Sequence, residues 1–340
     1  MSVRTLILSF AALASLAVAP ATRAGDFDKY VPAKSEFYVH ITPPKFFTSQ
    51  LVRKAVPMAF ERYGDQMVEG MALLKGLPGA PDLPEDQLKA AIKDLGDEQK
   101  IAQGFDIAKK FVTDIVIAGS AQAGMPDAIV LIKSEAISKE GADMIAQMSG
   151  AFPQAGKIDV VKKSMGTIYV MTPPQGDQKV YFTVPEKGIL HIASSEELAE
   201  QSFGAAGKPS EKLAAQIAKR NANDFLFVAG VGNEQADFTA MAVNLILDKD
   251  LTSKFDVEYK DAAKASDQAK EANQHLGEMV EKIREALGAK GEALKTQIAK
   301  TKAEANGTKV SASLSIPGKI VEELLKPEKE KEKEKPKEME

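Results

Sequence analysis

The three histidines, His40, His191 and His275, could support the widest range of chemistry, because imidazole binds metals and transfers protons. Two imidazoles that share one metal from a helix stand four residues apart, and no two of these histidines have that spacing. His40 and His191 lie in apolar runs typical of strands, and His275 lies in a helical segment. We predict packing or surface positions for all three and no metal ligand. The absence of cysteine excludes thiolate metal sites and disulfides.

The segment 204–210 (Gly-Ala-Ala-Gly-Lys-Pro-Ser) faintly resembles a phosphate-binding loop. That motif requires four residues between its glycines and Ser or Thr directly after the lysine. Here two residues separate the glycines and Pro209 follows the lysine, so we interpret the segment as a helix connector. Ser120 follows Gly119, but Gln122 stands where a nucleophile elbow requires glycine. No cofactor-binding residue is therefore predicted.

Among the many carboxylates, Asp114 and Asp224 stand beside apolar strands, where burial could raise a carboxyl pKa. Each directly precedes its strand, so turn formation and capping are the favoured roles. No set of side chains has the spacing of a catalytic site, and we predict no catalytic residue. A hydrolase whose residues meet only in three dimensions is the alternative.

Short apolar runs that predict strands are joined by segments with helical periodicity. The expected strands are Phe37–Ile41, Asp114–Gly119, Ala128–Ile132, Ile158–Val161, Thr167–Met171, Val180–Val184, Ile189–Ala193, Phe225–Ala229, Phe255–Tyr259 and Val310–Ile316. The expected helices are Phe46–Leu74, Pro84–Gly96, Ser138–Ser149, Glu196–Phe203, Ser210–Arg220, Ala236–Leu247 and Ala262–Ala305. Turn-rich connections predict an antiparallel meander over residues 158–193. The pattern indicates an α+β fold with antiparallel-dominated sheets covered by helices.

Local signals refine these elements. Pro57 is expected to kink or split the helix that contains it. Ser194 and Glu197 have the spacing of a capping box. Gly288 and Gly291 are expected to divide the long helical region into two helices.

The order of elements suggests an internal repeat. The strand 37–41 and its helix are echoed by the strand 225–229 and the helix expected after it, and the run 128–161 is echoed by 255–316. Duplication and chance similarity are both open. The apolar stripe Leu276–Ile298 is expected to cover a sheet of its own domain, with a partner helix as the alternative.

The N-terminus has the pattern of a secretion signal. Arg4 precedes the apolar stretch Leu6–Ala19, and small residues follow, so cleavage is expected after Ala24, with Ala21 as the second choice. The apolar stretch of about 14 residues is shorter than the roughly 20 that a spanning helix needs. No membrane span is therefore expected after cleavage.

We divide the chain into a signal peptide (1–24), an N-terminal α+β unit with the meander (25–220), a C-terminal α+β unit with long helices (221–326) and a Lys/Glu tail (327–340). The tail has almost nothing apolar to bury, so we predict that it is disordered.

Loss of Arg4 and Arg23 with the leader takes the formal net charge from −4 to −6. Binding to nucleic acid requires clustered positive charge, so we expect no such partner. An exported, disulfide-free protein of this size suits the periplasm or the extracellular space of a bacterium.

Four stretches together resemble a loose group of exported bacterial proteins of unknown function, in which a secretion signal precedes repeated α+β units. The stretches are residues 31–54, 104–119, 188–203 and 255–280. The likeness lies in the order of strands, helices and turn residues and covers most of residues 31–325. It implies a fold style and an envelope location, and it implies no catalytic residue.

These observations favour a non-enzymatic exported protein that binds a protein or envelope partner, or that has a structural role in the envelope. A desolvated carboxylate or a strand histidine in a deep pocket would instead favour the hydrolase. An exposed apolar surface would favour the binding protein.

Overall fold

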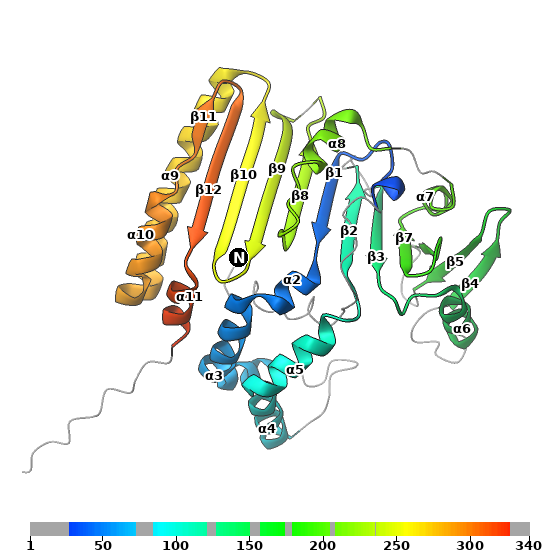
Figure 1. Cartoon of the computed structure of the whole chain (residues 1–340), viewed down its shortest axis with the longest axis horizontal. Helices are drawn as coiled ribbons and strands as arrows, with labels where there is room; N and C mark the ends of the chain where they lie inside the picture. Colours follow the sequence, from blue (N-terminus) through cyan, green and yellow to red (C-terminus); the bar gives the residue numbers. More distant parts are fainter. Residues whose placement is uncertain are drawn as a thin grey trace, which may run out of the picture.

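The computed structural model describes residues 27–72, 84–120, 127–149, 157–173, 179–204, 208–234 and 236–326. The expected signal peptide and the expected disordered tail lie outside these residues. The described part is an α+β fold built on one twelve-stranded sheet, in which every pair of neighbouring strands is antiparallel (Figure 1).

The strands follow one another across the sheet in the order β11-β12-β10-β9-β8-β1-β2-β3-β7-β6-β5-β4. Their bounds are β1 Phe37–Ile41, β2 Asp114–Gly119, β3 Ala128–Lys133, β4 Lys157–Lys162, β5 Thr167–Thr172, β6 Val180–Thr183, β7 Ile189–Ala193, β8 Leu226–Val231, β9 Phe238–Leu247, β10 Leu251–Tyr259, β11 Glu304–Asn306 and β12 Lys309–Ile316. The order β7-β6-β5-β4 confirms the predicted meander.

The helices lie around this sheet in separate groups (Figure 1). Their bounds are η1 Asp28–Tyr30, α2 Pro43–Thr48, α3 Gln50–Ala72, α4 Glu85–Leu95, α5 Glu98–Ala108, α6 Lys139–Ser149, α7 Glu196–Gln201, α8 Glu211–Ile217, α9 Ala262–Leu287, η3 Gly288–Gly291, α10 Glu292–Lys300 and α11 Gly318–Leu325. In Figure 1, α2 to α5 are grouped beyond one end of the strands, and α9 and α10 lie along the β11–β12 side.

One face of the sheet forms the main core, because η1, α7 and α8 pack on it. Tyr38 and Phe227 are fully buried there, with their ring centroids 6.4 Å apart. Leu198 of α7 and Leu213 of α8 belong to the same apolar cluster. We call this side the covered face.

The prediction of a helix over Ala236–Leu247 is wrong, because most of this segment forms the strand β9. Alanine, methionine and leucine favour a helix when the segment is considered alone. In the structure Ala240 and Ala242 are buried on the covered face, whereas Met241 and Val243 point to the other face. Pairing with both β8 and β10 therefore overrides the local preference.

Pro57 does not split the N-terminal helical region, which was one of the two outcomes predicted for it. It lies inside α3, and the chain breaks earlier, between α2 and α3 at Ser49. The Ser49 hydroxyl donates to the carbonyl of Asp248 at 2.9 Å, and the amide of Leu51 donates to the same carbonyl at 2.7 Å. The break thus lies where the chain is tied to the β9–β10 connection.

The long C-terminal helical region divides at Gly288–Gly291, as predicted, but it ends at Lys300. Residues predicted as the helix end form β11 instead, which pairs with β12. The stripe 276–298 is mostly packed within the fold: Val280 and Ile298 are buried, although Leu287 is 37% exposed. Helices α5 and α11 had no counterpart in the prediction.

The expected repeat receives little support from the pairing of strands. The first part of the repeat relied on a helix after the strand 225–229, and that segment forms the strand β9 instead. In its second part β10 pairs directly with β12, whereas β3 and β4 are separated by β7, β6 and β5. The sheet also crosses the expected unit boundary at 220/221, since β1 pairs with both β2 and β8, so the two-unit division stays a prediction.

The cap of α7 differs by one residue from the predicted capping box. Ser195, not Ser194, is the N-cap, and its side chain accepts a hydrogen bond from the amide of Leu198 at 3.3 Å. Ser194 accepts from the amide of Ala128 instead.

Ser195→Ala is therefore expected to lower the free energy of unfolding by about 1 kcal/mol, because an amide at the helix start loses its partner. Ser195→Asn retains a capping oxygen and should restore most of that loss in urea denaturation. Equal losses in the two variants would show that the hydroxyl does not act as a cap.

Candidate functional site

The second face of the sheet carries an uninterrupted aliphatic surface over its six central strands, β9, β8, β1, β2, β3 and β7. We call it the aliphatic face and define it by twelve side chains, each of them half-buried: Val39, Ile41, Ile115, Ile117, Val130, Ile132, Leu190, Ile192, Leu226, Val228, Val243 and Leu245.

The register of the strands puts these side chains on one side of the sheet. Val39 lies opposite Val228 on one neighbouring strand and Ile117 on the other. Directly opposed residues point to the same side, so these contacts continue as a row across the sheet. The alternate residues, such as Tyr38 and Phe227, are buried on the covered face.

Two described helices pack on this second face, one toward each end of the sheet. Toward the β4 side, Ala142 and Ala146 of α6 pack against Tyr169 and Phe182, whose strands continue the same row. Toward the β12 side, α9 packs through small residues on Val310 and Ala312. The aliphatic face therefore lies between α6 at one end of the sheet and α9 at the other.

Among the clusters of buried residues in the described ranges, none joins a helix to the six central strands through this side of the sheet. Helices α7 and α8 contact the sheet through the covered face, and α3 and α4 form a small core of their own around Val68, Leu88 and Ile92. Antiparallel sheets with one open face normally place polar residues on it. A contiguous apolar surface in their place is typical of an interaction site.

The three histidines lie in different environments in the structure. His40 is buried on the covered face, and its Nε2 lies 2.9 Å from Oδ1 of Asp114. His191 is 1% exposed, and burial lowers its pKa to about 4. His275 is exposed on α9 beside Glu278. Among the described residues no group of three His, Asp or Glu side chains could hold a metal ion.

The two acids that the sequence singled out have different partners. Asp224 accepts hydrogen bonds from the amide of Asn221 at 2.7 Å and from Nδ2 of Asn244 at 2.6 Å, which confirms its predicted turn role. Burial nevertheless raises the pKa of Asp224. Asp114 pairs with His40 rather than with a turn amide. That pair was missed because its members are joined only by the pairing of β1 with β2.

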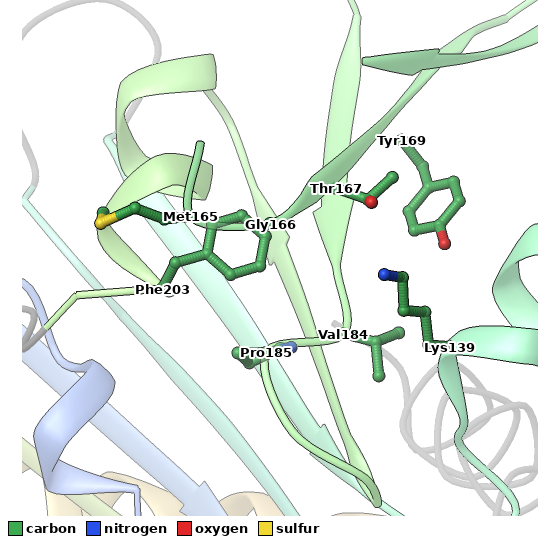
Figure 2. A pocket seen from close by; sticks show the side chains of 8 residues that line it. All are labelled: Lys139, Met165, Gly166, Thr167, Tyr169, Val184, Pro185 and Phe203. Carbon is green, nitrogen blue, oxygen red and sulfur yellow. The ribbon is translucent and has the colours of Figure 1, made fainter. Parts of the chain in front are cut away.

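A small cavity of about 160 Å³ lies beside α6 and is shown in Figure 2. Lys139, Tyr169 and Phe203 are among the side chains that line it. The Tyr169 hydroxyl donates to Asp143 at 2.6 Å, and burial together with this bond raises its pKa. A larger cleft of about 860 Å³ lies between α3 and α4. No described residue that lines either cavity is a histidine.

The segment 204–210 connects α7 with α8, as predicted, and Ser210 caps α8 by accepting from the amide of Leu213. Residues 205–207 lie outside the described ranges. Within those ranges none of the helices combines the length and the apolar character that crossing a bilayer requires.

Comparison with known proteins defines no family for this chain. No family model matches it, and no curated protein matches it. Solved structures that are similar include crystal forms III and I of TP0453, each with 8% sequence identity and a TM-score of 0.41. The first comparison covers 87% of this chain and 96% of the other, and the second covers 89% and 97%. At that TM-score the likeness carries no inference about function.

Proposed function

We propose that this protein is a non-enzymatic binding protein of the bacterial envelope, exported to the periplasm or beyond, and that its aliphatic face receives an apolar ligand or partner. The observation that carries the proposal is the half-buried aliphatic surface between α6 and α9, which belongs to no cluster of buried residues in the described part of the chain. The leader-like N-terminus supports export, and the α+β fold on one open sheet supports a binding role.

The energy available from covering this face is large enough for useful affinity. Full burial of one valine or isoleucine side chain contributes about 1.5–3 kcal/mol. A third of that from each of the twelve side chains is on the order of 6–12 kcal/mol before the cost of association. A micromolar complex requires about 8 kcal/mol.

The hydrolase alternative would have to use the buried pair His40 and Asp114. This pair lies on the covered face, opposite the apolar surface, and neither cavity described above is lined by either residue. The geometry therefore favours binding over hydrolysis.

We expect the native protein at neutral pH to bind the apolar dye anilinonaphthalene sulfonate saturably on the aliphatic face. The double variant Val39→Thr/Val228→Thr keeps the β-branched shape and places two hydroxyls in the row. Its affinity for the dye should fall about tenfold, the factor that 1.4 kcal/mol represents. Fluorescence titration measures this change.

Val160→Thr is the matched control, because Val160 is 45% exposed on the edge strand β4, outside the aliphatic face. Its dye affinity should remain that of the native protein. Cooperative urea unfolding of all three proteins would establish that each is folded. Unchanged binding in the double variant, or no binding by the native protein, would contradict the proposed function.

A further inference from the structure

We infer that this chain forms a two-fold symmetric dimer through the open edge of β4, so that the sheets of two copies join antiparallel and the two α6 helices flank the junction. The inference goes beyond the proposed function and does not depend on the aliphatic face. It is carried by the free backbone groups of β4, the exposed apolar side chains beside them and the order of charges along the strand.

The two edges of the sheet differ in how far they are protected. At one edge β11 has only three residues, all of them exposed, and α9 lies beside it (Figure 1). At the other edge β4 has six residues, and no described strand pairs with its outer side. Proteins commonly protect a sheet edge by making it short or by covering it. Within the described part of the chain, only the β11 edge is protected in these ways.

The pairing of β4 with β5 determines which backbone groups are free. The amide of Lys163 donates to the carbonyl of Gly166 at 2.8 Å, and this pair closes the hairpin between the two strands. Backbone groups alternate in direction along an antiparallel strand, so those of Ile158 and Val160 point away from β5. The Ile158 amide already donates to the hydroxyl of Ser149 at 3.3 Å. Val160 therefore presents its amide and its carbonyl to a further strand.

Exposed apolar side chains lie on one side of this edge. Val160 is 45% exposed, and it lies opposite Tyr169, which packs on α6, so its side chain points to the α6 side of the sheet. On α6, Met144, Ile145 and Met148 are 60%, 61% and 50% exposed, and their spacing of three or four residues places them on one face. An apolar outer face on a helix whose inner face is already buried is typical of an interaction surface.

The outer face of α6 is turned toward the edge of the sheet. The Tyr169 hydroxyl donates to Asp143 at 2.6 Å, so Asp143 lies on the inner side of the helix, toward β5. Ile145 lies about 200° further around the helix, because each residue advances by about 100°. A two-fold axis normal to the sheet at Val160 keeps both α6 helices on the same side of the joined sheet. The outer faces of the two helices then flank the junction.

The order of charges along β4 favours a second copy as the partner. With the axis at Val160, this residue lies opposite its counterpart in the other copy, and Asp159 lies opposite Val161 of that copy. An axis at Asp159 or at Lys162 would instead place like charges opposite each other, which is destabilising. The strand and the outer face of α6 thus complement themselves about one axis. An unrelated strand would satisfy the backbone groups but would not supply the second apolar helix.

The size of the contact sets the expected affinity. Each copy contributes one strand of six residues and four exposed apolar side chains. Specific interfaces typically bury about 800 Å² on each partner, and this contact belongs at the small end of that range. We therefore expect a reversible dimer with a Kd on the order of 10 μM.

The test is the oligomeric state of the full chain, measured by sedimentation over a range of concentrations. The native protein should show a monomer–dimer equilibrium. Val160→Lys and Val160→Glu each place like charges at the axis, and each should raise the Kd at least about tenfold, equivalent to 1.4 kcal/mol. An equal mixture of the two variants should recover the dimer, because opposite charges then face each other.

Ile107→Lys is the matched control, because Ile107 is 57% exposed on α5, which does not contact β4, and this variant should dimerise like the native protein. Cooperative urea unfolding shows whether each variant is folded. A native protein that remains monomeric up to about 100 μM would overturn the inference. So would a mixture of Val160→Lys and Val160→Glu that stays monomeric, or a dimer that only Val39→Thr/Val228→Thr dissociates. Dye binding to the aliphatic face tests the proposed function separately.

Discussion

Phe227→Ala is expected to lower the free energy of unfolding by about 3–5 kcal/mol, whereas Val228→Thr on the same strand should lower it by less than about 1 kcal/mol. Phe227 is fully buried on the covered face and packs edge-on against Tyr38. Truncation removes its apolar contacts and leaves a cavity beneath α8. Val228 is half-buried on the aliphatic face and belongs to no cluster of buried residues in the described part of the chain.

Urea denaturation at neutral pH measures both free energies of unfolding. The comparison tests whether the covered face and the aliphatic face differ in packing. Both residues lie on β8; alanine has a lower strand preference than phenylalanine, whereas threonine keeps the β-branched shape of valine, so strand preference adds to the expected difference. A loss in Val228→Thr as large as that in Phe227→Ala would mean that the second face is covered. That result would contradict the assignment of the aliphatic face as an open surface.

His191 should make the protein less stable as the pH falls from about 6.5 to about 4. Burial lowers its native pKa to about 4 from the ordinary histidine value of about 6.5. Within this window the unfolded chain binds a proton that the native state does not, so acid favours unfolding. At pH 4.5 the free energy of unfolding is lower by about 2.5 kcal/mol for this reason, at 1.36 kcal/mol for each pKa unit.

The measurement is the change in unfolding free energy between pH 7 and pH 4.5, in the native protein and in His191→Leu. The native protein should lose about 2.5 kcal/mol more than the variant. Asp28 and Asp224, whose pKa values are raised by burial, act in the opposite direction in both proteins and cancel in the comparison. An identical pH dependence of the two proteins would show that His191 does not titrate as a buried base.

The strands were largely predictable because they are short apolar runs bounded by turn residues. Residues 128–132 and 189–193 could be placed from composition alone, and so could the meander, since its connections are short. The strand β9 could not, because alanine and methionine alternate in it and its partners on both sides decide its conformation. The break at Ser49 depends on contact with Asp248, which is distant in the sequence.

The candidate site could not be predicted from the same patterns. A run such as Asp114–Gly119 is apolar on both sides and indicates a strand buried on both faces. Which face is open depends on where α6 to α9 pack, and the sequence does not fix this. The pair of His40 and Asp114 arises in the same way, from the register of β1 against β2. The sequence identified the individual residues, but it did not show which residues contact them in the folded chain.

The position of β1 between β2 and β8 has a consequence for the folding of the chain. The pairing of Ile41 with Leu226 closes a very long loop, and contacts of such high sequence separation form slowly. Until β8 is available, one hydrogen-bonding edge of β1 has no partner and can act as a template for aggregation. A chain that completes its sheet only after most of it has been synthesised therefore remains incompletely folded for longer.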